Sequence, residues 1–92
     1  MGARGSREVD LHGLTTVQAE RRAAQELHAS RMRREGTLVL VTGRGFGNRL
    51  QEPVLRRHLE AWLRGPEGVR LGVIGVRVTS KGGALELRLG ST

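Results

Sequence analysis

A run of six residues, Thr37–Thr42 (TLVLVT), lies between two segments with helical periodicity and constrains the fold more than any other sequence feature. Its four central residues are all Leu or Val, without the polar–apolar alternation of a strand that has one face in water. Such a run is typical of a central strand that is covered at least partly on both faces. Because the chain has only 92 residues, the pattern indicates one small α/β domain.

The segment before this run has the start and stop signals of a helix. Thr15 and Gln18 have the spacing of a capping box, so we expect a helix from about Thr16 to Arg34. Gly36 is the natural residue to end it. Its buried side is expected to consist mostly of small residues, Ala19, Ala23 and Ala24, together with Val17 and Leu27.

The segment after the run has the strongest amphipathic pattern in the chain. Pro53 is a favourable first helical residue, and Gly65 with Pro66 ends the pattern. At 100° per residue, the apolar residues and one histidine occupy one half of this second helix. The expected buried half consists of Val54, Leu55, His58, Leu59, Trp62 and Leu63.

Three further strands complete the prediction. Residues 8–12 alternate between polar and apolar, as do residues 85–89. Residues 69–79 are also β-rich, but their alternation changes phase between Val73 and Ile74, which indicates either a bulge or two separate strands. The order β-α-β-α-β-β predicts a two-layer α/β sandwich, with a four-stranded mixed sheet and two helices on one face. We expect residues 1–7 to be disordered and residues 8–92 to form the domain.

The charge balance is strongly basic. Fifteen Arg and one Lys oppose nine acidic residues, for a net charge of +7. The arginine fork suits phosphate oxygens, so nucleic acid is the expected partner, although an excess of solvated arginines would give the same count. Only Phe46 and Trp62 are aromatic, so recognition of single strands by base stacking is not favoured.

Composition also excludes several classes of protein and site. The absence of cysteine excludes disulfides, thiolate zinc sites and cysteine nucleophiles. No apolar run approaches the length of about 18 residues that a membrane span requires, and no signal peptide is recognisable, so we expect a cytoplasmic protein without a membrane partner. We also expect the isolated domain to be monomeric.

Asp10 and His12 form the first candidate for a chemical site. Residues two apart on a strand project from the same face, so the carboxylate could orient the imidazole as it does for a general base. Gly13 would allow close approach of a substrate backbone. The pattern D-x-H alone is weak evidence for a chemical site. The alternative is that Asp10 and His12 form a purely structural pair.

The second candidate is the glycine-rich loop that follows the central strand. Gly43 and Gly45 could turn backbone N–H groups toward an anion, and Arg44 could clamp it. We also expect Arg49 to contact nucleic acid, together with Lys81 in the turn before the last strand. The spacing matches neither a Walker loop nor a dinucleotide fingerprint, and a flexible connection remains the alternative. No metal-ligand pattern is present; a divalent ion becomes a candidate cofactor if the substrate is DNA.

Four segments together resemble the small MutS-related (Smr) domain family. They are VDLHGLT (9–15), VTGRG (41–45), EPVLRRHLEAWL (52–63) and GGALELRL (82–89), and the similarity covers about residues 8–90. The resemblance implies a β-α-β-α-β-β sandwich that cleaves or binds nucleic acid. It implies a role in cleavage for Asp10 and His12, and in substrate binding or catalysis for Gly43, Arg44 and Gly45.

Three functions follow as hypotheses. The leading one is an endonuclease that cleaves phosphodiester bonds of DNA or RNA with Asp10 and His12. The second is a non-catalytic DNA- or RNA-binding module of a larger protein. The third is a protein-interaction domain whose basic surface meets acidic protein segments.

Overall fold

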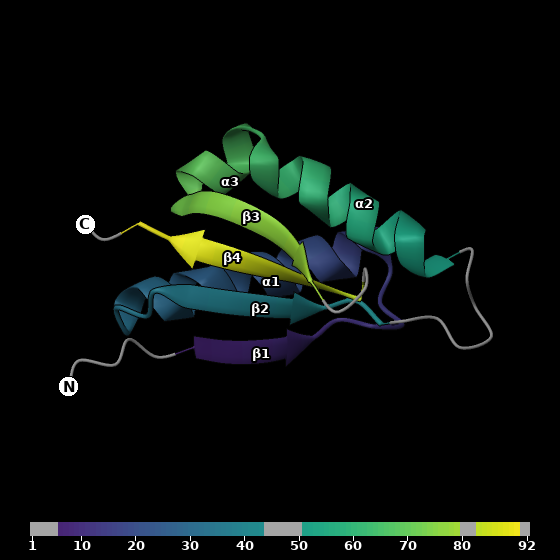
Figure 1. Cartoon of the computed structure of the whole chain (residues 1–92), viewed down its shortest axis with the longest axis horizontal. Coiled ribbons are helices and arrows are strands. Elements are labelled where there is room, and N and C mark those ends of the chain that lie inside the picture. The colour runs from purple at the N-terminus through teal and green to yellow at the C-terminus, as the bar shows by residue number, and fades with distance from the viewer. Residues whose placement is uncertain (1–5, 44–50, 80–82, 91–92) are drawn as a thin grey trace.

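The chain forms a single mixed sheet with helices packed against it. In the computed structural model, residues 6–43, 51–79 and 83–90 are described. The elements are β1 (Ser6–Asp10), α1 (Thr16–Met32), β2 (Thr37–Val41), α2 (Gln51–Arg64), α3 (Pro66–Arg70), β3 (Val73–Thr79) and β4 (Ala84–Leu89), as Figure 1 shows. The strand order is β1-β2-β4-β3, with β1 parallel to β2 and β4 antiparallel to both β2 and β3. The predicted α/β class and mixed four-stranded sheet are confirmed, and α3 is an additional short helix.

One face of the sheet carries the core. The strand register places Val9 beside Leu40, and Leu40 beside Leu85, so their side chains share a face. These residues are buried in one cluster with Ala19 and Leu27 of α1. Both long helices therefore cover the same face, as predicted, and α2 contributes Leu55, Leu59 and Leu63 to the same cluster. The predicted contact of Trp62 with this core is also present.

The buried stripes of both helices are narrower than predicted. Val17, Val54 and His58 were expected inside, but the two valines are 62% and 59% exposed and His58 is also exposed. In the described part of α2, the buried apolar residues are Leu55, Leu59 and Leu63, which are spaced four residues apart. A helix that packs with one side on a sheet buries a narrow stripe and not half of its circumference. His58 instead reaches Glu20 of α1, with 2.5 Å between Nε2 and Oε2, and links the two helices at their surface.

Two boundaries differ from the prediction because of local backbone conformation. The first helix ends at Met32, and Arg34 takes a left-handed conformation (φ 59°) before the predicted glycine is reached. After α2, Pro66 starts α3 with Gly65 as its N-cap, so Val69 is helical and not part of a strand. The β-rich segment begins only at Val73, where the predicted bulge is confirmed by a register shift.

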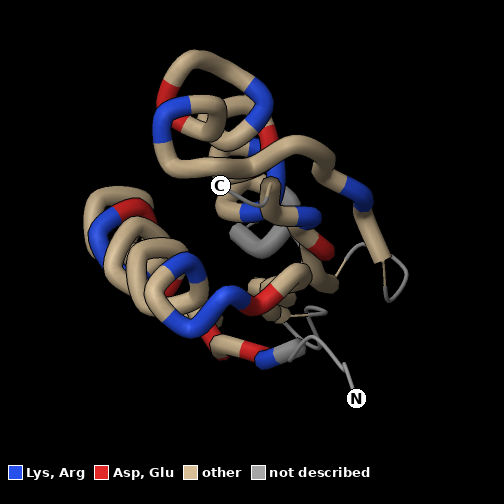
Figure 2. Tube along the Cα trace, turned by 90° about the vertical axis from the view of Figure 1, so that its left-hand side faces the viewer, with Lys and Arg blue, Asp and Glu red and all other residues tan. Residues whose placement is uncertain are grey.

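Most charged side chains in the described part of the chain take part in ion pairs. Figure 2 shows where the Lys, Arg, Asp and Glu residues lie along the chain. The pairs include ladders along α1 and α2 and a cross-strand pair between β3 and β4: Arg22–Glu26, Arg56–Glu60, Arg64–Glu60, Arg70–Glu67 and Arg77–Glu86. Five arginines in this part of the chain take part in no ion pair: Arg21, Arg31, Arg34, Arg57 and Arg88. These five contribute most of the unneutralised positive charge that the structure describes.

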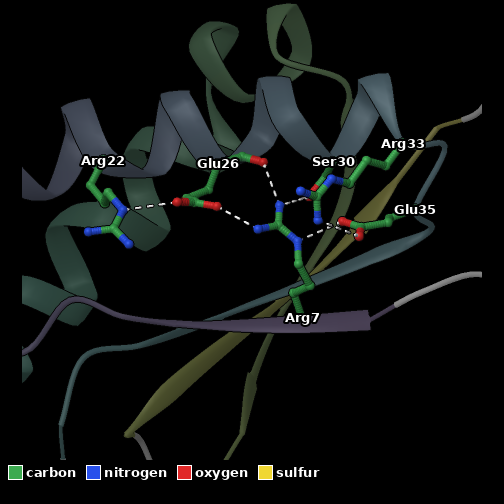
Figure 3. Close-up of polar contacts among 6 residues, drawn as sticks. All are labelled: Arg7, Arg22, Glu26, Ser30, Arg33 and Glu35. Carbon is green, nitrogen blue, oxygen red and sulfur yellow. Dashed lines mark hydrogen bonds and ion pairs between the residues drawn. The ribbon is translucent and has the colours of Figure 1, made fainter.

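Arg7 attaches the outer strand β1 to the helix layer (Figure 3). Strand β1 begins at Ser6, so residues 6 and 7, expected in a disordered segment, belong to the sheet. The guanidinium of Arg7 donates to Glu35 at 2.9 Å, to Glu26 at 2.7 Å and to Ser30 Oγ at 2.9 Å. The hydrogen bond from Arg7 lowers the pKa of Glu26. Burial alone would raise the pKa of Glu35, but hydrogen bonds from Arg7 and Ser30 outweigh burial, so the pKa of Glu35 is also lowered.

The other outer strand, β3, is protected by a helix. Arg64 at the end of α2 donates to the carbonyl of Val76 at 3.0 Å, which satisfies one acceptor on β3. None of the described helices is both long enough and apolar enough to cross a membrane.

Candidate functional site

Three segments that are distant in sequence meet at one end of the sheet. Strands β1, β2 and β3 run in the same direction, so they all end at this edge, and the antiparallel strand β4 begins there (Figure 1). We call it the site edge; it is formed by the ends of β1, β2 and β3 at Asp10, Val41 and Thr79 and by the start of β4 at Ala84. The topology therefore places the D-x-H segment and the start of the glycine-rich segment side by side.

Asp10 and His12 are joined by a turn and not by strand geometry. Strand β1 ends at Asp10, whereas the alternation had predicted that it continues through His12. One oxygen of Asp10, Oδ1, accepts the backbone N–H of His12 at 3.0 Å and lies 2.6 Å from His12 Nδ1. A side chain that binds the backbone two residues ahead forms an Asx turn, which ends the strand and brings the two groups together.

The loop that carries Asp10 and His12 is held by contacts with the core and with β2. Leu11 is fully buried, and its N–H donates to Val41 on β2 at 2.7 Å. Gly13 has φ +81°, a conformation that residues with a side chain rarely adopt, and the N–H of Leu14 closes the turn on Leu11. The Asp10 carboxylate and the His12 imidazole are 59% and 67% exposed. Both groups are therefore accessible, while the backbone of their loop is held by the contacts of Leu11 and Leu14.

The contact changes the chemistry of both groups. The side-chain hydrogen bond with His12, followed by its backbone N–H, lowers the pKa of Asp10, so this carboxyl stays ionised. A carboxylate at Nδ1 favours the tautomer that carries its proton there. Nε2 is then the basic nitrogen of the ring, which is the arrangement that a general base requires.

The start of the glycine-rich segment is held by a single carbonyl group. Gly83 O accepts the N–H of Thr42 at 2.9 Å, the N–H of Gly43 at 3.2 Å and the hydroxyl of Thr42 at 3.4 Å. The side chain of Thr42 is buried, so it supports the edge from inside. Gly43 has φ +100°. Sequence reasoning treated residues 81–83 as a turn that carries Lys81 and missed that Gly83 fixes the second segment, because nothing in the sequence specifies that contact.

The first helix also begins at this edge. Thr15 caps α1: its side chain accepts the N–H of Gln18, and the Gln18 side chain accepts the N–H of Thr15, as predicted. The first turn contains no acidic residue. The positive end of the helix dipole is therefore not neutralised by a carboxylate in that turn, which favours anions near the loop that carries His12.

The remaining predicted residues do not all fall in this arrangement. Four of them, Arg44, Gly45, Arg49 and Lys81, lie outside the described residues. Of the other histidines, His58 is on the helix layer and His28 is exposed on α1. Across residues 6–43, 51–79 and 83–90, no group of three or more His, Asp and Glu is arranged to hold a metal ion.

Comparison with known proteins identifies a family model and a similar solved structure. The family model described as Smr domain matches residues 9–84. Among solved structures, the crystal structure of the Smr domain of Thermus thermophilus MutS2 is similar, with a TM-score of 0.71 and 28% identity. That alignment covers 91% of this chain and 98% of the other. The search of curated proteins returned no match.

Proposed function

Since the chain belongs to the Smr domain family, whose members are associated with nucleic acids, we propose that it binds nucleic acid at the site edge and cleaves phosphodiester bonds there. The observation that carries this proposal is the Asp10–His12 pair, which is exposed and shares an edge with Gly43. Registered strand neighbours are about 4.8 Å apart, so one phosphate can lie near both segments.

His12 would act as the general base and Asp10 as the residue that orients it. On RNA, the 2′-oxygen attacks the adjacent phosphorus while its proton passes to His12 Nε2. The bond from phosphorus to the 5′-oxygen breaks, that oxygen takes up a proton, and a cyclic 2′,3′-phosphate remains. On DNA the nucleophile would have to be water, and a divalent ion is a candidate participant in that reaction. The RNA route requires fewer protein groups, which is why we favour it for this domain.

The glycine-rich segment would bind the phosphate. Gly43 has no side chain to obstruct the approach of a phosphate to this edge, and Arg44 follows it directly in the sequence. We propose that Arg44, Gly45, Arg49 and Lys81 contribute to binding, with Arg44 stabilising charge on the phosphate during cleavage. The net charge of +7 supports attraction of the polyanion over a longer range.

The second candidate function is binding without cleavage. It is supported by the same edge, since an exposed imidazole and backbone N–H groups also hold a phosphate that is not cut. This alternative predicts affinity that falls steeply with salt, by a slope near 0.9 in log K against log salt for each neutralised phosphate on duplex DNA, but no products.

Incubation with supercoiled DNA and with single-stranded RNA, each with and without EDTA, tests the proposal. His12→Ala should reduce cleavage about 100-fold or more, because a general base contributes at least that much. His28→Ala is the matched control, since His28 is also exposed but lies on α1 away from the Asp10 turn. Cleavage by His12→Ala at the wild-type rate would exclude the mechanism, and binding without cleavage by the unaltered chain would establish the second candidate.

A further inference from the structure

The end of the sheet opposite the site edge carries a second exposed surface. It contains the connection from α1 to β2 and the connection from α3 to β3, and it faces the viewer in Figure 2. Five residues define what we call the distal surface: Arg31, Met32, Arg34, Val69 and Ile74. None of them contributes to the core or to the site described above.

Contacts around Gly72 link parts of this surface. The side chain of Arg31 lies over Gly72, because a Cβ placed on Gly72 would be 3.1 Å from Arg31 Cδ. The carbonyl of Gly72 accepts the N–H of Gly90 at 2.9 Å, and a Cβ placed on Gly90 would be 3.1 Å from the Cγ2 methyl group of Ile74. The N–H of Gly72 in turn donates to Val69. Arg31 thus connects the end of α1 with the segment between α3 and β3.

The surface is apolar and basic at the same time. Met32, Val69 and Ile74 are 73%, 72% and 65% exposed, which makes them the three most exposed large apolar residues of the described chain. Arg31 and Arg34 beside them take part in no ion pair within the same described part. Exposed apolar groups rimmed by charge mark protein interfaces, in which Met and Arg are both enriched.

We propose that the distal surface binds an acidic protein segment whose carboxylates alternate with aliphatic side chains. The carboxylates would pair with Arg31 and Arg34, and the aliphatic groups would cover Met32, Val69 and Ile74. A nucleic-acid backbone would satisfy the arginines but would leave the three aliphatic side chains in water, so it fits the surface less well.

The partner is expected to be a different chain. Apart from Glu8, every acidic side chain that the structure describes is already engaged with an Arg or a His. Among the described residues, a second copy of the chain therefore offers only Glu8 as an unpaired carboxylate, and its own net charge of +7 would oppose the approach. This inference does not depend on cleavage at the site edge.

The proposal is tested by NMR titration of the ¹⁵N-labelled chain with a synthetic peptide, (Glu-Leu-Asp-Leu)₃. A twelve-residue polyglutamate and a DNA duplex are titrated separately for comparison. Amide shifts should concentrate at Met32, Arg34, Gly72, Ile74 and Gly90 for the first peptide. Arg31→Glu with Arg34→Glu should weaken its binding about tenfold or more, and Ile74→Thr should weaken it while leaving polyglutamate unchanged.

Matched variants distinguish this surface from a general charge effect. The double variant Arg21→Glu with Arg57→Glu removes two other arginines that form no ion pair among the described residues. The single variant Val54→Thr removes an exposed valine of the helix layer. Both variants should leave peptide affinity within about twofold of the unaltered chain. The proposal is overturned if the peptide shifts no distal amide at millimolar concentration, or if both double variants weaken it equally. It is also overturned if the distal variants reduce duplex affinity as much as peptide affinity, which would make the surface a nucleic-acid contact.

Discussion

A single carboxylate oxygen of Asp10 holds both the backbone N–H and the Nδ1 of His12, at 3.0 and 2.6 Å. Replacing the carboxylate with an amide should therefore disturb the ring more than the backbone, because an amide oxygen can still accept the N–H but no longer stabilises a charged imidazole. We expect Asp10→Asn to lower the cleavage rate about tenfold to 100-fold. The measurement is the single-turnover rate on the better of the two substrates.

Glu8→Gln is the control for that variant, since Glu8 is exposed on the same strand two residues earlier. A general base must be unprotonated, so activity should rise with pH across the neutral range as the imidazole of His12 loses its proton. Because the pKa of Asp10 is lowered, its carboxylate is already ionised throughout that window and adds no second step. Equal rates for Asp10→Asn and Glu8→Gln would show that Asp10 does not orient the base.

The identity of the nucleophile can be decided with one substituted nucleotide. If the 2′-oxygen attacks, an RNA substrate with a 2′-deoxy nucleotide at the cleavage position should be cut at least about 100-fold more slowly, because the attacking group is missing. Undiminished cleavage of that substrate would rule out the cyclic-phosphate route. Chromatography of the products provides an independent check through the presence or absence of a 2′,3′-cyclic end.

Arg44 should affect binding and not stability. It lies between two glycines, so its side chain has few neighbours in the sequence to pack against. We expect Arg44→Ala to change the free energy of unfolding by less than about 0.5 kcal/mol and to weaken nucleic-acid binding. Arg57→Ala, at an exposed arginine of α2 without an ion pair among the described residues, is the comparison. A large loss of stability with unchanged affinity would contradict the assignment.

The Arg7 cluster should make stability depend on acid. Glu26 and Glu35 have folded-state pKa values below their ordinary 4.5, so their contribution is present above that pH and is lost as pH falls through the lowered values. Replacing Arg7 with Met should cost about 2 kcal/mol at pH 7, since several charge-assisted hydrogen bonds disappear. Denaturant unfolding between pH 7 and pH 3 should show a weaker acid dependence in the variant; an unchanged dependence would show that other carboxyl groups are responsible.

Gly68 should tolerate no side chain. A Cβ at this position would lie 1.6 Å from the carbonyl oxygen of Leu63, so α3 would have to move away from the end of α2. We expect Gly68→Ala to lower the free energy of unfolding by about 3 kcal/mol. Gly65→Ala is the matched change, because its Cβ would meet backbone oxygens only at 3.4 Å, and it should cost no more than about 1 kcal/mol. Similar unfolding midpoints for the two variants would contradict this packing.

The periodicity of the sequence was sufficient for the order of the main elements but not for their contacts. The capping box at Thr15 and the phase change after Val73 are local signals, and both features occur where they were expected. The short helix α3 was missed because Val69 fits a β-rich pattern, whereas Pro66 and the tight contact at Gly68 favour a helical turn. Val17 was misplaced because its side of α1 is determined by tertiary packing.

The contact between Asp10 and His12 was predictable from the sequence, but its geometry was not. Asp10 and His12 were paired on the assumption of a continuing strand, but the contact comes from a turn that the aspartate itself makes. Arg7 could not have been recognised as a structural residue, because its partners are 19 to 28 positions away in sequence. Such long-range contacts leave no trace in local periodicity.

The carbonyl of Gly83, which receives three donors from Thr42 and Gly43, links two segments separated by about forty positions. Together with the contact from Leu11 to Val41, it means that no short contiguous piece of the chain contains the whole proposed site. Closing such long loops carries an entropic cost that only the finished sheet offsets, so we expect the arrangement to exist only in the folded sheet. Catalytic rate in a denaturant titration would then follow the fraction of native molecules, which makes activity itself a probe of the global folding transition.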